Sequence, residues 1–316
     1  MLPLTRDSTT LTVSTLAAIE ADATSKAKTV TELAESPNTI YVAFAGSFYA
    51  QSAAHLFYWI LRQLTDKTIY IQPIEAFLYH TLAYHEETSL LVLFAEPGAE
   101  NIIARTADAA RITETRFIIV STPLPDIIAA RIGKENLIEV TSQRPSVHYM
   151  LLAAKSAAYL AEKFSGIRIR VNRLLNELSD ISYVYDSLID RYKQFINDFV
   201  ETVKAGKELS VYASTTMLPT AYILSGYIHR VNVYPVSSLP VHMTARLLHG
   251  TVLAMLTDVE ADILKEARFK LSMYAPKDAR ILELVLHTDP LTAPLYGLLV
   301  VEHAIDRIDH NLPSTS

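Results

Sequence analysis

The chain has 316 residues, half of them hydrophobic and a fifth charged, which is enough for two domains with sizeable cores. Its net charge of -6, with Lys and Arg scattered along the sequence, argues against a nucleic-acid-binding role. No apolar run reaches the roughly 18 residues that span a bilayer, so we expect no membrane segment. The absence of cysteine excludes disulfides, thiolate metal sites and thiol nucleophiles.

The start of the sequence has no basic stretch followed by an apolar core, so we expect no signal peptide and a cytoplasmic location. Residues 1–38 are predicted to form a helical segment, which Ser36-Pro37-Asn38 ends.

A first domain is predicted over residues 39–170, where apolar strands alternate with helices. The strands are expected at 40–45, 69–72, 90–94, 117–121 and 137–140, and the helices at 50–64, 74–84, 100–112, 125–132 and 145–165. This alternation is typical of a parallel sheet that helices cover on both faces.

A long linking helix is predicted over 171–207, because apolar residues there recur every three or four positions. The stripe consists of Ile181, Tyr185, Leu188, Tyr192, Phe195 and Phe199. We interpret its aromatic residues, together with Tyr183, as core or as a contact with another subunit.

A second domain is predicted over 208–316 on the same plan. Its strands are expected at 209–213, 231–234, 252–256 and 281–286, and its helices near 217–229, 258–272 and 294–308. Each half places a turn of small residues directly after its first strand, at Gly46-Ser47 and at Ser214-Thr215-Thr216. We therefore predict two similar doubly wound, flavodoxin-like α/β domains, with a ligand site near these turns.

The order and spacing of several segments resemble proteins with tandem sugar isomerase (SIS) domains. The segments are AGSFYAQSAAHL at 45–56, IQPIEAFLYH at 71–80, LFAEPGAENIIARTADAA at 93–110, YIHRVNVYPVSSLPVH at 227–242 and DPLTAPLYGLLVVEHAIDR at 289–307. The nearest parallels are the isomerase domain of glucosamine-6-phosphate synthase and the archaeal glucosamine-6-phosphate deaminases. The resemblance implies a sugar-phosphate site beside the first-domain strand ends, where hydroxyls and backbone N–H groups hold the phosphate. It also implies a homodimer, since family sites often borrow a histidine from the neighbouring subunit.

The first loop keeps Gly46 and Ser47 of the family pattern, but Phe48 replaces its second serine. Ser47 could bind an anion together with the helix N-terminus, and we favour the alternative that it is only the helix N-cap. The turn of Ser214, Thr215 and Thr216 is the best remaining candidate for an anion cradle, although such residues also fill ordinary turns.

The family's Ser-x-Ser-Gly-x-Thr loop aligns with residues 94–100, where Gly98 is kept and the hydroxyls are lost. Glu96 and Glu100 appear instead, and a phosphate beside them would be repelled unless a cation intervened. The two carboxylates could select an amino sugar or a metal, or could belong to a solvated loop.

The family's proton-transferring glutamate aligns with Leu224, which cannot carry a proton. The remaining candidate catalytic residues are His242 and Glu75. His242 lies in the stretch that keeps the family's histidine. Glu75 could equally cap a helix near its first turn. The resemblance therefore predicts a divergent, non-catalytic sugar-phosphate-binding protein without a cofactor. The alternative is an active aldose–ketose isomerase or deaminase, acting on a hexose-6-phosphate or amino sugar phosphate, with relocated catalytic groups such as His242 with Glu75 or Glu96.

Two further readings are weaker. The spacing of His303, Asp306 and His310 on one helix face permits zinc, but zinc pairs usually stand four residues apart and a third ligand lies elsewhere. A nicotinamide-dependent enzyme is disfavoured, because the turn AFAGSFYA has one glycine and lacks the G-x-G-x-x-G spacing.

Overall fold

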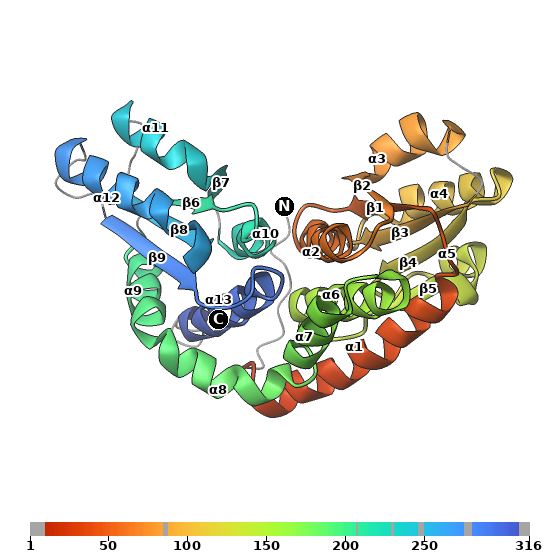
Figure 1. Ribbon diagram of the computed structural model, residues 1–316, viewed down its shortest axis with the longest axis horizontal. Coiled ribbons are helices and arrows are strands. Elements are labelled where there is room, and N and C mark those ends of the chain that lie inside the picture. The colour runs from red at the N-terminus through yellow and green to blue at the C-terminus, as the bar shows by residue number, and fades with distance from the viewer. Residues whose placement is uncertain are drawn as a thin grey trace, which may run out of the picture. The chain divides into compact units, whose positions relative to one another are not determined.

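The computed structural model describes residues 10–84, 88–206, 208–228, 231–245, 250–274 and 280–309. The chain divides into two compact units (Figure 1). The N-terminal unit comprises residues 17–181, and the C-terminal unit comprises residues 182–316 together with the first 16 residues. The predicted linking segment is therefore shared between the two units.

The N-terminal unit contains a five-stranded parallel sheet in the order β2-β1-β3-β4-β5. Its strands are β1 (Thr39–Ala45), β2 (Thr68–Pro73), β3 (Ser89–Ala95), β4 (Arg116–Ser121) and β5 (Leu137–Glu139). The central strands β1 and β3 are apolar and buried almost throughout, as expected of parallel strands covered on both faces.

Successive side chains of these strands point to opposite faces of the sheet. The face that carries Tyr41 and Leu91 packs against α4 (Glu100–Ile112) and α5 (Asp126–Ile132). On the same face, the predicted helix at 74–84 forms as α3 (Ile74–Ala76), which continues as a π-turn and then a 3-10 turn to Tyr84. The helices α2 (Tyr49–Leu64) and α6 (Pro145–Phe164) pack against each other, and α2 also lies along β1, β2 and β3.

Helix α1 (Val13–Leu33) is held to α6 by a buried ion pair. Lys155 Nζ lies 3.1 Å from Glu20 Oε1 and also donates to the Leu178 carbonyl at 2.5 Å, while the Ile181 N–H donates to the same Glu20 oxygen at 2.9 Å. Both side chains are more than nine-tenths buried, so loss of either one would leave the other charge buried without its counter-ion.

The segment predicted as one linking helix forms three: α7 (Arg168–Glu177), α8 (Ile181–Arg191) and α9 (Lys193–Lys204). The expectation of a single helix was wrong because local hydrogen bonding ends α7. The Ser179 side chain donates to the Asn176 carbonyl, which takes that carbonyl out of the helical ladder. The aromatic stripe is largely core of the C-terminal unit, since Tyr185, Tyr192 and Phe199 are buried and only Tyr183 is widely exposed.

The C-terminal unit contains a four-stranded parallel sheet in the order β7-β6-β8-β9. Its strands are β6 (Leu209–Ala213), β7 (Asn232–Pro235), β8 (Thr251–Thr257) and β9 (Arg280–Leu286). The face that carries Val211 and Leu253 packs against α9, α10 (Leu218–Tyr227) and α13 (Ala293–Asp309). The opposite face, with Tyr212 and Val252, packs against α11 (Leu239–Thr244) and α12 (Asp262–Tyr274).

The two sheets thus share one strand order over their first four strands, with the first strand of each lying between the second and the third. In such a sheet the connections leave in opposite directions on either side of the first strand, and a ligand crevice forms at the carboxyl ends there. None of the helices in the described ranges combines the length and apolarity needed to span a membrane.

Candidate functional site

The carboxyl ends of β1 and β3 bring the first predicted turn and the acidic loop together. The two strands are in register with Ala45 opposite Ala95, so the next residues, Gly46 and Glu96, are neighbours. The Glu96 N–H donates to the Ala45 carbonyl at 2.8 Å, which fixes the loop against the end of β1.

The Glu96 carboxylate lies at the N-terminus of α2 and accepts three main-chain hydrogen bonds. Oε1 accepts from the N–H groups of Phe48 and Ala50, both at 2.9 Å, and Oε2 accepts from the Ser47 N–H at 3.3 Å. The N–H groups of Phe48 and Ala50 are among those that a helix start leaves without internal partners, and Ser47 directly precedes them. The helix dipole favours a negative charge there. The anion cradle of the N-terminal unit, which we define as the N–H groups of Ser47, Phe48 and Ala50, is therefore occupied by the protein's own carboxylate.

Glycine at position 46 is required by this arrangement. Gly46 has φ +130°, which side chains rarely adopt, and a Cβ there would lie 2.5 Å from Glu96 Cδ. The expectation that Ser47 is the N-cap was wrong, because α2 begins at Tyr49 with Phe48 as N-cap and no side-chain cap bond. Glu96, distant in sequence, performs that function instead.

Burial raises the pKa of Glu96 above its usual range, although the backbone N–H bonds act in the opposite direction. The neighbouring phenols respond to the same environment. Burial, and then the Glu96 charge, raise the pKa of Tyr49. Tyr149, whose ring lies 4.8 Å from that of Tyr49, donates to the Ala95 carbonyl at 2.6 Å and also has a raised pKa from burial. The ionised carboxylate is thus held in a partly desolvated position.

The other predicted site residues of the N-terminal unit, Glu75, Gly98 and Glu100, donate or accept none of the hydrogen bonds of the cradle. Glu100 stands in the first turn of α4, and its carboxylate accepts the Gly98 N–H at 3.0 Å. Gly98 itself is exposed, with φ +94°. Glu75 is exposed in the first turn of α3.

The C-terminal unit repeats the main feature of the cradle with different groups. Ser214 follows β6, is buried and accepts the Met217 N–H at 3.3 Å, while Thr215 is exposed. Thr216 Oγ1 donates to Glu260 Oε1 at 3.1 Å, and Glu260 Oε2 accepts from both the N–H and the hydroxyl of Thr257. In both units a glutamate in the loop after the third strand thus reaches the turn after the first strand.

Glu260 was absent from the residues chosen from the sequence. Its signal was present as Thr257-x-x-Glu260, the pattern of a capping box at the end of β8. That the free carboxylate oxygen would turn toward Thr216 depends on the parallel pairing of β6 with β8, which no local pattern states.

His242 is oriented by two tyrosines of the sheet. Its Nδ1 lies 2.7 Å from the Tyr212 hydroxyl, and its ring makes T-shaped contacts with the rings of Tyr212 and Tyr234, whose centroids lie 5.6 and 5.1 Å from its own. Burial, and then Tyr234, raise the pKa of Tyr212 to about 12, so at neutral pH this phenol is protonated. His242 and Glu75 belong to different units.

The zinc reading of α13 finds no support in the described part of this helix. His303 Nδ1 lies 3.1 Å from the Tyr185 hydroxyl, and Asp306 Oδ2 accepts the Leu11 N–H at 2.8 Å. His310 lies outside the described residues. Across the described ranges, no three His, Asp or Glu side chains gather as a metal-ligand set.

Comparison with known proteins identifies the fold. No family model matches the sequence, and no curated protein matches it. Solved structures do match along nearly the whole chain. The C-terminal domain of glucosamine-fructose-6-phosphate aminotransferase from Francisella tularensis is 13% identical, with a TM-score of 0.66 and coverage of 94% of this chain and 95% of that one.

Glucosamine-6-phosphate deaminase from Thermotoga maritima is 13% identical, with a TM-score of 0.62 and coverage of 92% and 94%. Tagatose-6-phosphate ketose/aldose isomerase from Escherichia coli is 14% identical, with a TM-score of 0.59 and coverage of 96% and 92%. At these identities the likeness establishes the fold. The predicted pair of parallel-sheet α/β units is thereby confirmed, since structures with this fold match nearly the whole chain.

Proposed function

We propose that this protein binds a sugar phosphate without isomerising it, and that Glu96 competes with the ligand for the anion cradle. The observation that carries the proposal is the set of three main-chain hydrogen bonds to the Glu96 carboxylate. A phosphate oxygen is the same kind of acceptor as a carboxylate oxygen, and a helix N-terminus binds either. The cradle thus keeps the geometry of an anion site while the protein fills it.

The position of Glu96 makes its displacement energetically accessible. Burial raises the pKa of this carboxyl, which means that loss of water destabilises its ionised form. This cost offsets part of the stabilisation that the three hydrogen bonds give to the carboxylate. A phosphosugar that took over the same N–H groups would return Glu96 to water. The structures with this fold include proteins whose names specify phosphosugars, which supports a ligand of that class.

The residues of the C-terminal unit support the expectation that there is no turnover. Leu224, at the position of the family's glutamate, is fully buried in the core formed by α10, α13 and the sheet. His242 has one ring nitrogen engaged by Tyr212, which leaves one nitrogen for proton transfer. An aldose–ketose isomerisation needs a base that removes a proton from carbon, and the aliphatic side chain of Leu224 cannot supply it.

The test is calorimetric titration of fructose-6-phosphate and glucosamine-6-phosphate into the wild type and the Glu96→Ala and Glu100→Ala variants, with turnover assays in parallel. We expect no turnover, and at least tenfold tighter binding by Glu96→Ala than by the wild type or Glu100→Ala. Binding that is equal in all three proteins would refute the competition. Turnover that disappears in His242→Ala would instead establish the alternative, an active isomerase or deaminase.

We also propose that the two units derive from one duplicated module, that the protein is cytoplasmic and that it forms a homodimer. The duplication is supported by the common strand order and by the glutamate that reaches the first turn in each unit. Most of the aromatic stripe packs inside its own unit, so it offers little surface for a second subunit. The homodimer is therefore proposed from the family resemblance alone. Light scattering that gives a monomer at micromolar concentration would exclude the dimer.

A further inference from the structure

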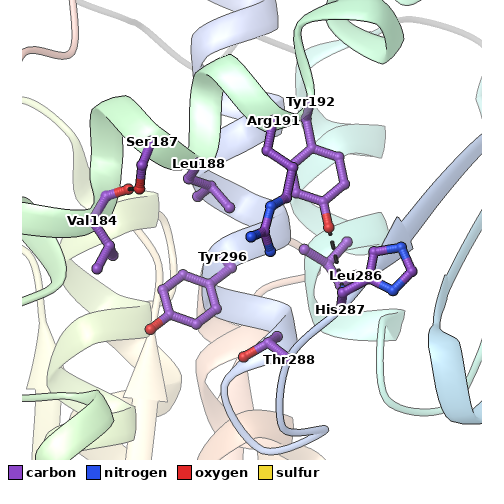
Figure 2. A pocket seen from close by; sticks show the side chains of 9 residues that line it. All are labelled: Val184, Ser187, Leu188, Arg191, Tyr192, Leu286, His287, Thr288 and Tyr296. Carbon is purple, nitrogen blue, oxygen red and sulfur yellow. Dashed lines mark hydrogen bonds between the residues drawn. The ribbon is translucent and has the colours of Figure 1, made fainter.

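A pocket lies in the C-terminal unit, where the edge strand β9 ends. Its volume is about 220 Å³, and its walls come from α8, the residues that follow β9, and the first turn of α13 (Figure 2). It is separated from the turn after β6 by the intervening strand β8, and none of its lining residues belongs to either cradle. The pocket is therefore a different site from the anion cradle at the start of α2 and from the turn after β6.

One cation dominates the pocket. Arg191 is the last residue of α8, and its guanidinium points between Leu188, Tyr192 and Tyr296 (Figure 2). Among the described residues, no carboxylate lies within ion-pair distance of Arg191. A guanidinium in this position offers two parallel N–H donors, which match a carboxylate.

Hydrogen bonds within the protein fix the residues that form the wall of the pocket around Arg191. The Tyr192 hydroxyl donates to the Val285 carbonyl at 3.0 Å and accepts the His287 N–H at 3.3 Å. Thr288 Oγ1 lies 3.2 Å from Thr292 Oγ1. The bonds of Tyr192 hold the end of β9 against the junction between α8 and α9, so this wall of the pocket is fixed before a ligand arrives.

The remaining lining is suited to an apolar group. Leu188 and Leu286 face the pocket with the ring of Tyr296, and Leu286 is almost completely buried (Figure 2). The pocket is smaller than the roughly 300–1,000 Å³ of sites for drug-sized molecules, so it fits a small metabolite.

The charge near the pocket limits the ligand to one negative charge. Arg191 supplies a single positive charge, and the other basic side chain, His287, has its Nδ1 3.6 Å from Asp258 Oδ2. A dianion would face this aspartate without a second full cation to balance it. We infer that the pocket binds a small monocarboxylate with an apolar body, whose carboxylate pairs with Arg191 and whose body lies against Leu188, Leu286 and Tyr296.

The test uses benzoate as the probe, with its neutral isostere benzamide and inorganic phosphate as comparisons. Calorimetric titration and thermal shift are measured on the full chain, on Arg191→Gln, and on Arg170→Gln, an exposed arginine of α7 in the other unit. Ser187→Trp adds a second variant, because Ser187 lines the pocket from the exposed side of α8 and a bulky ring there would fill it without altering the core.

We expect benzoate to bind the wild type and Arg170→Gln equally, and at least tenfold more weakly to Arg191→Gln and Ser187→Trp. Benzamide and phosphate should each bind at least tenfold more weakly than benzoate to the wild type. Failure of 10 mM benzoate to shift the melting temperature of the wild type would overturn the inference. Unchanged benzoate binding by Arg191→Gln, or phosphate binding as tight as that of benzoate, would overturn it as well. These outcomes are independent of Glu96, so they do not bear on the sugar-phosphate proposal.

Discussion

Replacing Glu96 with alanine removes the acceptor that the N–H groups of Ser47, Phe48 and Ala50 share at the start of α2. Two of these bonds are short and half-buried, and an N–H group left without a partner costs about 1–3 kcal/mol. The third belongs to Ser47, which is exposed and which water can reach. We therefore expect Glu96→Ala to lower the free energy of unfolding by at least about 2 kcal/mol.

An anion that enters the emptied cradle should reverse this loss. Sulfate at a hundredfold its dissociation constant would return about 2.7 kcal/mol, because a ligand that binds only the folded state adds RT ln(1 + [L]/Kd) to its stability. Sulfate is a suitable probe since its charge does not change between pH 5 and 8. The assay is urea unfolding followed by circular dichroism, at several sulfate concentrations and with chloride at matched ionic strength.

The matched control is Glu100→Ala, which removes a carboxylate from the same acidic loop but one that accepts only the Gly98 N–H. Its stability should change by less than about 1 kcal/mol, and sulfate should stabilise it no more than the wild type. Glu96→Gln, which keeps one acceptor oxygen, should fall between the wild type and Glu96→Ala. Equal stabilisation of Glu96→Ala and the wild type by sulfate would show that the carboxylate does not block the cradle.

Three further predictions concern stability. Lys155→Ala removes the ammonium group that balances the buried Glu20 carboxylate, and should lower the free energy of unfolding by about 3–5 kcal/mol, whereas Lys155→Met with Glu20→Leu should recover most of this loss. Burial, followed by the charge of Lys26, lowers the pKa of His148 to about 4. Because the unfolded histidine takes up its proton near pH 6.5, the stability of the wild type should fall by about 3 kcal/mol between pH 6.5 and 4, and a His148→Leu variant should lack this component. Gly46→Ala should cost about 1–3 kcal/mol, since its Cβ would meet Glu96 at a φ of +130°, and additive effects in the double variant with Glu96→Ala would show that this contact is not the cause.

Most strands of both sheets could be placed from the sequence to within a residue or two. Strands such as 90–94 and 252–256 are buried on both faces of parallel sheets, so they appear as apolar runs bounded by turn residues. The main helices followed from their apolar periodicity, as at 100–112 and 145–165. The break at Ser179 was missed because the apolar stripe continues across it, and periodicity does not register a single side chain that caps a carbonyl.

The candidate site could be predicted from the sequence only in part. Gly46, Ser47 and Glu96 were selected because each follows an apolar strand, and the structure brings these three together. The sequence predicts Ser47 as the cap and Glu96 as a carboxylate of a solvated loop, so it does not predict the hydrogen bond between them. The role of Glu96 as the acceptor for the start of α2 depends on a contact between residues almost fifty positions apart.

The sequence by itself determined the class of the fold, the order of its strands and helices along the chain, and the presence of two carboxylates, Glu96 and Glu100, after β3. These features depend on hydrophobic periodicity and residue identity, which are local. Only the tertiary structure decided that a carboxylate fills the cradle at α2, that Glu260 reaches the equivalent turn, and that Arg191 points into a pocket at the end of β9. The pairing of parallel strands sets which loops become neighbours, and that pairing is fixed by packing across the whole sheet.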